Sequence, residues 1–227
     1  MSKSDQLPAF VWLWFPLVLL AGQIAMEIAV PERTLSALLS EGGPHEAFEF
    51  IFTAAAFCVA LFTLQSVDWK TQRWLGLWVL LAVGCCFYVS GEEISWGQHL
   101  MHWTTPEFWS GINDQNETNL HNTSSWLDQK PRLILELGVL FGGIIMPLVR
   151  RFRPAMLPQK FNMIYPADIL SVTALVALFI NCADRIGNHF QDLFLFQRAS
   201  ELEELYLYYF VLLYLIILRR RILQNQR

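Results

Sequence analysis

The segment Trp74–Gly91, WLGLWVLLAVGCCFYVSG, decides the fold because it is apolar along its length and carries no charged residue. A helix needs roughly 20 predominantly apolar residues to cross the hydrocarbon core of a bilayer. The segment therefore predicts a membrane-spanning helix. It runs directly into GEEISWGQHLMHW, Gly91–Trp103, which gathers two carboxylates, a serine, a glutamine and two histidines at the end of that helix.

Five more apolar runs accompany this one in a chain of 227 residues that is 54% hydrophobic. They are Phe10–Val30, Ala47–Leu64, Leu133–Val149, Ile169–Cys182 and Leu205–Leu218. This composition excludes a disordered chain and is untypical of a soluble domain. The sequence predicts an all-α fold: a polytopic membrane helix bundle of about six transmembrane helices with elaborated outer loops. Residues 1–227 are expected to form a single integral membrane domain.

The distribution of Lys and Arg predicts which way the bundle faces, because positive residues collect on the cytoplasmic side. With the N-terminus inside, eleven Lys and Arg fall in inner segments and five in outer segments. We therefore expect a bacterial inner-membrane protein with both termini in the cytoplasm. All five histidines then fall on the outer side. Topology accounts for the inner basic residues, so no nucleic-acid partner is expected.

If the third span continues as a helix beyond Gly91, four polar residues fall on one stripe of its surface. They are Glu92, Ser95, His99 and His102, at spacings of three, four and three residues. Such a stripe can ligate a divalent metal or pass protons, because imidazole and carboxylate serve both purposes. It can also be an interfacial helix that only faces lipid headgroups. Glu92 and Glu93 favour a site, since charge beside an apolar span is costly.

Two other outer segments carry polar residues that we expect to reach the same place. The loop Ile112–Asn122, INDQNETNLHN, is rich in Asn and Asp, which favour turns over helix. We expect it to fold back over the bundle and bring Asn119 or His121 to the stripe. The end of the fifth span adds Asp184 and Asn188, which share a helical face and are expected to line the same cavity.

Five of the six predicted spans bring an acid to the outer third of the bundle. They are Glu27, Glu49, Glu92, Glu136 and Asp184. Buried carboxylates must be neutral, paired or metal-bound, so we expect these acids to converge on one outward-facing cavity lined by acids and histidines. By contrast, Glu201, Glu203 and Glu204 precede the last apolar run, where the positive end of a helix dipole accounts for them.

The pattern EEISWGQ followed by NETNLHN resembles a family of uncharacterised bacterial polytopic membrane proteins over residues 90–122. That resemblance implies a membrane fold and no activity. The Ser-x-x-x-His spacing of Ser95 and His99 also resembles, more loosely, the hydrolase superfamily that contains alkaline ceramidases and adiponectin receptors. Those proteins hold zinc with this element, a following Asp, matched by Asp114, and a late His-x-x-x-His, which the sixth predicted span lacks.

These observations leave the chemistry open between different classes of function. The first is a metal-dependent hydrolase or transferase acting on a lipid or lipid-linked substrate, with metal-activated water as nucleophile and a carboxylate as general base. The alternatives are a non-catalytic transporter, an ion-conducting subunit, or an assembly subunit of a membrane complex. The expected partners are membrane lipid and other membrane protein subunits, and the expected cofactor is a divalent metal such as zinc.

The candidate site residues divide by role. The catalytic candidates are Glu92, Glu93, Ser95 and His99. The metal-ligand candidates are His99, His102, His121 and Asp184. The substrate-binding candidates are Gln98, Asn119, Asn122 and Asn188.

Overall fold

The computed structural model describes residues 5–40, 43–113, 116–120, 123–190 and 195–226. The side chains of residues 99, 100, 125, 127 and 128 also lie outside the described part. The described chain is helical between its turns and loops and contains no strand. Its helices are α1 (Phe15–Ala29), α2 (Glu32–Leu38), α3 (Pro44–Gln65), α4 (Arg73–Glu93), α5 (Gln98–Met101), α6 (Glu107–Ser110), α7 (Ser125–Leu140), α8 (Met146–Phe152), α9 (Ser171–Phe190) and α10 (Ala199–Asn225).

Five helical stretches are long and apolar enough to cross a membrane. They are Phe10–Ala29, Pro44–Gln65, Arg73–Glu93, Gln129–Phe152 and Asp168–Phe190. They confirm the first five predicted spans as helices of that length and composition. The sixth predicted span, Leu205–Leu218, lies in α10, which has 27 residues but is not one of the five. Acids at the start of α10 and arginines at its end leave too short an apolar stretch between them.

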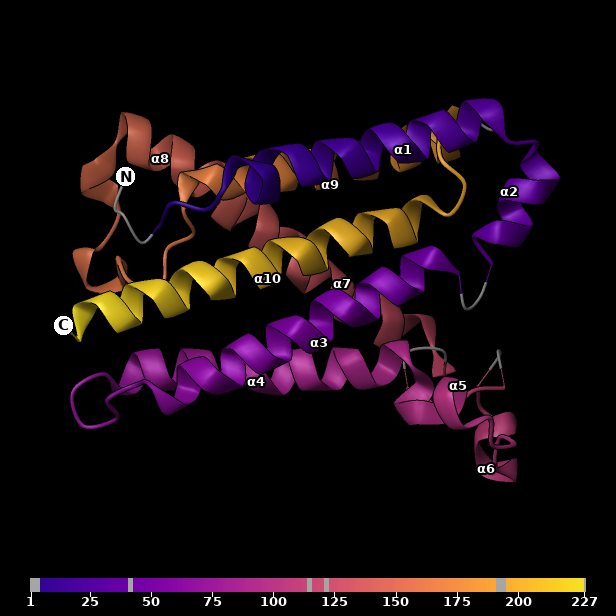
Figure 1. Cartoon of the computed structure of the whole chain (residues 1–227), viewed down its shortest axis with the longest axis horizontal. Helices are drawn as coiled ribbons and strands as arrows, with labels where there is room; N and C mark the ends of the chain where they lie inside the picture. The colour runs from indigo at the N-terminus through magenta and orange to yellow at the C-terminus, as the bar shows by residue number, and fades with distance from the viewer. Residues whose placement is uncertain (1–4, 41–42, 114–115, 121–122, 191–194, 227) are drawn as a thin grey trace.

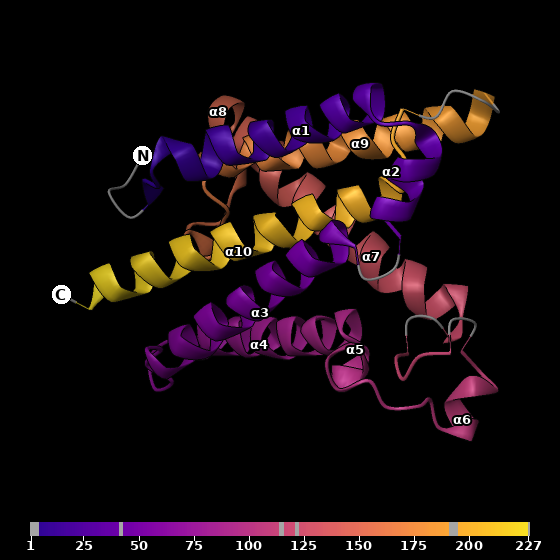
Figure 2. The ribbon, with the colours of Figure 1, turned by 45° about the vertical axis from the view of Figure 1, so that its right-hand side comes forward.

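α10 is instead the central helix of the bundle. α1 and α9 lie on one side of it, and α3 and α4 lie on the other (Figures 1 and 2). Its side chains contribute to both hydrophobic cores, one shared with α9 and the other shared with α3 and α4. Tyr206, Leu213 and Leu215 are fully buried there. Because its neighbours surround it, α10 can carry charged residues that a lipid-facing helix could not.

The two ends of the bundle differ in what they carry. Both chain termini lie at one end, together with α8 and the turn between α3 and α4 (Figures 1 and 2). We call this the terminal end. The short helices α2, α5 and α6 lie at the opposite end, which we call the loop end (Figures 1 and 2). The polar residues that the sequence singles out therefore gather away from the termini.

A π-helical turn, Phe10–Trp14, leads into α1 just before a proline. A π turn pairs each N–H with the carbonyl five residues earlier, so Pro16 would have to donate to Val11, but proline has no N–H. Tyr209 Oη donates to the Val11 carbonyl oxygen instead, at 2.7 Å. A side chain of the central helix thus completes the backbone hydrogen bonding of this π turn. The π turn Phe141–Ile145 precedes a second proline in the same way.

A tryptophan folds over a glycine at each end of α4. A Cβ atom on Gly76 would lie 2.8 Å from the ring of Trp69, and one on Gly91 would lie 2.8 Å from the ring of Trp96. Real side chains do not tolerate so close an approach, so glycine is needed at both positions. The contact between Trp96 and Gly91 matters most, because it shapes the turn that follows α4.

Candidate functional site

The polar stripe predicted to extend the third span does not form, because α4 ends at Glu93. Ser95 and Trp96 have φ angles of 47° and 55°, and Gly97 has a φ of 103°, so the chain changes direction before α5 begins. The prediction of a continuous helix through this segment is wrong. The physical reason is local: glycine adopts a positive φ at little cost, and the turn lets the Trp96 ring pack on Gly91.

The turn carries Glu92 into contact with the loop that follows α6. Its Oε1 accepts a hydrogen bond from Trp96 Nε1 at 2.6 Å, and its Oε2 accepts one from the backbone N–H of Leu120 at 2.6 Å. Both oxygens of this buried carboxylate are therefore satisfied by donors. Hydrogen bonds to a charged acceptor are the stronger kind, so Glu92 fastens the loop to the end of α4.

Ser95 provides the second attachment. Its Oγ donates to Glu117 Oε2 at 2.8 Å and accepts a hydrogen bond from Asn119 Nδ2 at 3.1 Å. Asn113 Nδ2 in turn donates to Asn119 Oδ1 at 2.7 Å. Ser95 and Asn119 are completely buried. The loop therefore folds back and brings Asn119 to Ser95, as the sequence predicts.

Gln98 completes this arrangement. Its Oε1 accepts a hydrogen bond from the backbone N–H of Thr118 at 2.8 Å, and its Nε2 donates to Thr105 Oγ1 at 2.8 Å. We call the connected residues the loop network: Glu92, Ser95, Gln98, Asn113, Glu117, Thr118 and Asn119. The candidate catalytic and substrate-binding residues within it form hydrogen bonds that hold the loop in place. Their chemical roles stay predictions.

The other candidates are not brought to the loop network. His102 is exposed and has a φ of 53° at the end of α5. Asn188 Nδ2 donates to Asp184 Oδ2 at 3.2 Å on α9, which lies across α10 from α4 and α5 (Figures 1 and 2). The side chain of His99 and the residues Asp114, His121 and Asn122 lie outside the described part of the chain.

The five acids expected in one cavity are likewise divided. Glu27 accepts hydrogen bonds from Gln23 Nε2 and from the backbone N–H of Gln197, both at 2.8 Å, and so ties α1 to the segment before α10. Glu92 belongs to the loop network, and Asp184 belongs to the α9 pair. The two remaining acids, Glu49 and Glu136, enter a different group of residues in the interior of the bundle.

That group centres on Glu49, Glu93 and Glu204, which we call the carboxylate cluster. They come from α3, α4 and α10, and one carboxylate oxygen of each lies within 4.8 Å of the others. Tyr208 Oη lies 3.2 Å from Glu93 Oε1 and 3.5 Å from Glu204 Oε2. Among the described residues, this is the one group of three acidic, His or Cys side chains with metal-ligand spacing. Glu93 is the one candidate site residue that it contains.

Glu49 is the least satisfied member of the cluster. Its side chain is only 2% exposed, and its Oε1 has no hydrogen-bond partner among the described residues. A buried carboxylate oxygen without a donor is costly, and native structures rarely keep one without a proton, an ion or a water. Glu49 therefore has one carboxylate oxygen that a proton, an ion or a water could satisfy.

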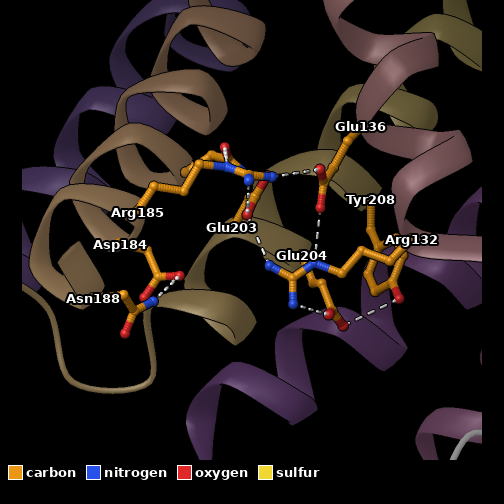
Figure 3. A network of polar contacts seen from close by, with 9 residues as sticks. Arg132, Glu136, Asp184, Arg185, Asn188, Glu203, Glu204 and Tyr208 are labelled. Carbon is orange, nitrogen blue, oxygen red and sulfur yellow. Dashed lines mark hydrogen bonds and ion pairs between the residues drawn. The ribbon is translucent and has the colours of Figure 1, made fainter. Parts of the chain in front are cut away.

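Arg132 stands beside the cluster and contacts three carboxylates (Figure 3). Its guanidinium lies 3.1 Å from Glu136 Oε1, 2.8 Å from Glu203 Oε2 and 3.0 Å from Glu204 Oε1. These acids come from both α7 and α10, so the contacts hold the two helices together. Glu204 is shared: its Oε1 faces Arg132, and its Oε2 faces Tyr208.

Further contacts connect this group to the surface of α9 (Figure 3). Asn181 Nδ2 donates to Glu203 Oε1 at 2.9 Å, and Arg185 Nε donates to Asn181 Oδ1 at 2.7 Å. Arg185 also lies 3.9 Å from Glu136, and its side chain is 68% exposed. A chain of polar contacts thus runs from an exposed guanidinium, through Arg132 and its acids, to the carboxylate cluster.

The charges along this chain do not balance. Five carboxylates face two guanidinium groups, of which one is exposed. The carboxylates are Glu49, Glu93, Glu136, Glu203 and Glu204. Carboxylates packed this closely in a poorly solvated place cannot all be ionised unless a further cation joins them. The group therefore carries protons or binds a cation.

The sequence did not identify Arg132, Glu203, Glu204 or Tyr208 as members of a site. The helix dipole predicted for the three acids before the last apolar run accounts only for Glu201, because α10 begins at Ala199 and only Glu201 lies in its first turn. The others belong to the next turn and point into the bundle. The sequence does contain a signal for this group, because Glu204 and Tyr208 are four residues apart and share a helical face.

Comparisons with family models, with curated proteins and with solved structures find no match for this chain. The two resemblances stated from the sequence motifs therefore stay predictions. Inference about function rests on the geometry of the described residues.

Proposed function

We propose that the chain is an integral protein of the bacterial inner membrane that crosses it six times, with both termini in the cytoplasm and the loop end outside. Two observations support this proposal. The Lys and Arg residues favour that orientation by eleven to five. Both termini lie at one end of the bundle, which requires an even number of crossings and therefore includes α10 (Figures 1 and 2).

We further propose that the protein takes up protons or cations from the outer side and binds them at the carboxylate cluster, as part of an ion-coupled transporter or ion-conducting protein. The observation that carries this is the chain of polar contacts that leads from exposed Arg185 towards Glu49, whose carboxylate is buried and has one unsatisfied oxygen. Ionisable residues inside a membrane bundle are costly, and their usual roles are proton relay and ion binding.

The same geometry disfavours a zinc hydrolase centred on Glu92 and Ser95. Both side chains are engaged in the loop network, where Glu92 accepts two hydrogen bonds and Ser95 joins Glu117 to Asn119. A general base or nucleophile acts on substrate, whereas these contacts of Glu92 and Ser95 are made to the loop. Among the described residues, Glu49 is the acid with an unsatisfied oxygen, and it lies among carboxylates and a tyrosine.

An apolar core separates the carboxylate cluster from the terminal end. Leu213, Leu215 and Leu218 of α10 are buried on the side of the terminal end, where α3 and α4 also contribute apolar residues. Ions that enter from the loop end therefore need a movement of the helices to leave at the other end. Alternating access of this kind is the normal mechanism of secondary transporters.

The test is ion movement in sealed vesicles that contain the purified full chain. A membrane potential is imposed, and a pH-sensitive dye in the lumen reports proton entry in the presence of a chelator. We expect wild-type vesicles to acidify faster than empty vesicles, and Glu49→Gln to remove this difference. The control is Glu107→Gln, which changes an exposed acid of α6 and should behave as wild type. Equal rates in wild-type and empty vesicles would reject proton coupling.

A metal-dependent hydrolase or transferase is the second candidate, now with its chemistry at the carboxylate cluster. The observation in its favour is the closeness of Glu93 to Tyr208, at 3.2 Å, which would allow one group to act as acid and the other as base. The expected substrate is a lipid or a lipid-linked molecule, since membrane lipid surrounds such a bundle. Incubation with membrane lipids followed by mass spectrometry would reveal products that Glu93→Gln fails to form.

A further inference from the structure

We propose that the carboxylate cluster is a binding site for one hard divalent cation, of the class formed by Mg²⁺, Mn²⁺ and Ca²⁺. Glu49, Glu93 and Glu204 supply one carboxylate oxygen each, and Tyr208 supplies a neutral oxygen beside them. The inference rests on the proposed function and deepens it, because it names the ion that the cluster takes.

The spacing of the oxygens suits a single ion. Hard divalent cations hold oxygen ligands at about 2.0–2.6 Å, so two ligands on opposite sides of the ion lie at most about 4–5 Å apart. The three carboxylate oxygens of the cluster lie within 4.8 Å of one another. Because they come from three different helices, an ion between them would tie α3, α4 and α10 together at one point.

The unsatisfied oxygen of Glu49 is an independent indication of a ligand. Its side chain is buried, and its Oε1 has no hydrogen-bond partner in the described chain. A structural role would normally place an N–H or O–H donor there, as the loop network does for both oxygens of Glu92. A divalent cation would satisfy the oxygen and neutralise the repulsion among the three acids together.

Arg132 contacts one of the proposed ligands but leaves the place of the ion open. It contacts Oε1 of Glu204, whereas Oε2 of the same carboxylate faces Tyr208. Its other contacts are to Glu136 and Glu203, which are not members of the cluster. Arg132 is therefore a positioning residue: it holds Oε1 of Glu204 and leaves Oε2 directed towards Tyr208, where an ion would bind.

The ligand atoms indicate the class of ion. All of them are oxygens, and carboxylate oxygen suits Mg²⁺, Ca²⁺ and Mn²⁺. Structural zinc sites are built from Cys and His, and catalytic ones usually include His. No His or Cys belongs to the group of ligands found among the described residues. The inference thus departs from the zinc expected on sequence grounds.

The test is a titration of the purified full chain with Mn²⁺ in detergent at neutral pH, in which electron paramagnetic resonance distinguishes free from bound Mn²⁺. We expect one Mn²⁺ per chain, displaced by excess Mg²⁺ or Ca²⁺. Glu49→Gln should weaken binding at least about tenfold, because one anionic ligand becomes a neutral amide of the same shape. Glu93→Gln is a second variant in case the first does not fold. Glu107→Gln should bind as wild type does.

Each outcome bears on the inference. Stoichiometric binding that is lost in Glu49→Gln or Glu93→Gln and kept in Glu107→Gln supports it. Absence of stoichiometric Mn²⁺ in wild type, or equal binding in the cluster variants, overturns it. The vesicle experiment is done with chelator, so it gives a separate answer. Proton entry without Mn²⁺ binding would leave proton uptake standing and reject this inference, whereas Mn²⁺ binding without proton entry would reject proton uptake and leave this inference standing.

Discussion

Glu92 and Glu93 are neighbours at the end of α4, yet they enter two polar regions of opposite character. Glu92 belongs to the loop network, in which its two oxygens accept hydrogen bonds from two donors. Glu93 belongs to the carboxylate cluster, in which three acids lie close together and Glu49 Oε1 has no hydrogen-bond partner among the described residues. Buried polar groups that have hydrogen-bond partners stabilise and specify a fold. Buried polar groups that lack them indicate places where a structure can bind a proton, an ion or a ligand.

Glu92 and Glu93 therefore differ in role: Glu92 is expected to stabilise the fold, and Glu93 is expected to take part in ion binding. If the loop network is structural, its variants should lose stability. If the carboxylate cluster is a cation site, its variants should lose ion binding and keep their stability. Free energies of unfolding in detergent can test this division.

Replacement of Arg132 should have the largest effect. Arg132→Met leaves Glu136, Glu203 and Glu204 without their shared cation in a largely buried place. Breaking a buried charge network from one side costs about 3–5 kcal/mol, so we expect a loss of that size in the free energy of unfolding. Denaturant titration followed by tryptophan fluorescence measures it.

Arg185→Met is the matched control for this variant. Its side chain is 68% exposed, so water can replace its contacts with Glu136, at 3.9 Å, and with Asn181 Oδ1, at 2.7 Å. We expect a change within about 0.5 kcal/mol. Similar losses in the free energy of unfolding would mean that the buried contacts of Arg132 stabilise the bundle no more than the exposed contacts of Arg185.

Glu92→Gln should have the next largest effect, because it attacks the loop network directly. Glutamine offers one oxygen and one NH₂ group, so either Trp96 Nε1 or the Leu120 N–H would face another donor. Hydrogen bonds to a charged group are worth about 1.5–3 kcal/mol each, and we expect a loss in that range. Hydrogen exchange of the Leu120 amide should rise in parallel. A stable variant with an unchanged amide would show that Glu92 does not fasten the loop.

Gly91→Ala tests the packing that shapes the same turn. A Cβ atom at this position would lie 2.8 Å from the ring of Trp96, which would have to move away. Overpacking of this kind costs typically about 1–3 kcal/mol. Gly84→Ala is the control within the same helix, since a Cβ there meets no atom within 4 Å. That control should stabilise α4 by roughly 0.5–1 kcal/mol. Thermal unfolding of both variants gives the comparison, and equal midpoints would contradict it.

The sequence predicts most of the fold because apolar length is a local property. Five of the predicted spans are helices of the expected kind. The position of α10 at the centre could not be read in the same way. Its charged ends make it look like a marginal span, and only its packing against α3 and α9 shows why it tolerates them.

The site was harder to predict because it depends on contacts between distant segments. The return of Asn119 to Ser95 was foreseen from loop composition, and the structure has that contact. The prediction of the polar stripe is wrong because helical periodicity assumes one continuous helix. The positive φ angles at Ser95 and Trp96 end that helix. Glu204 and Arg132 were missed because each has an ordinary local explanation, and only their 3.0 Å contact gives them another role.

Glu49→Gln should have the smallest effect on stability among the carboxylate variants. It is the same chemical change as Glu92→Gln at a carboxylate that is equally buried, but no donor satisfies Glu49 Oε1. In the absence of divalent cations, removing an acid from this crowded group relieves repulsion, so stability should be unchanged or higher within about 1 kcal/mol. With Mn²⁺ at a hundred times its dissociation constant, wild type should gain about 2.7 kcal/mol, because the ion binds only the folded state. Glu49→Gln should gain almost nothing at that concentration. A clear loss of stability in Glu49→Gln without metal would mean that Glu49 is a structural residue like Glu92, and the distinction between the two regions would then disappear.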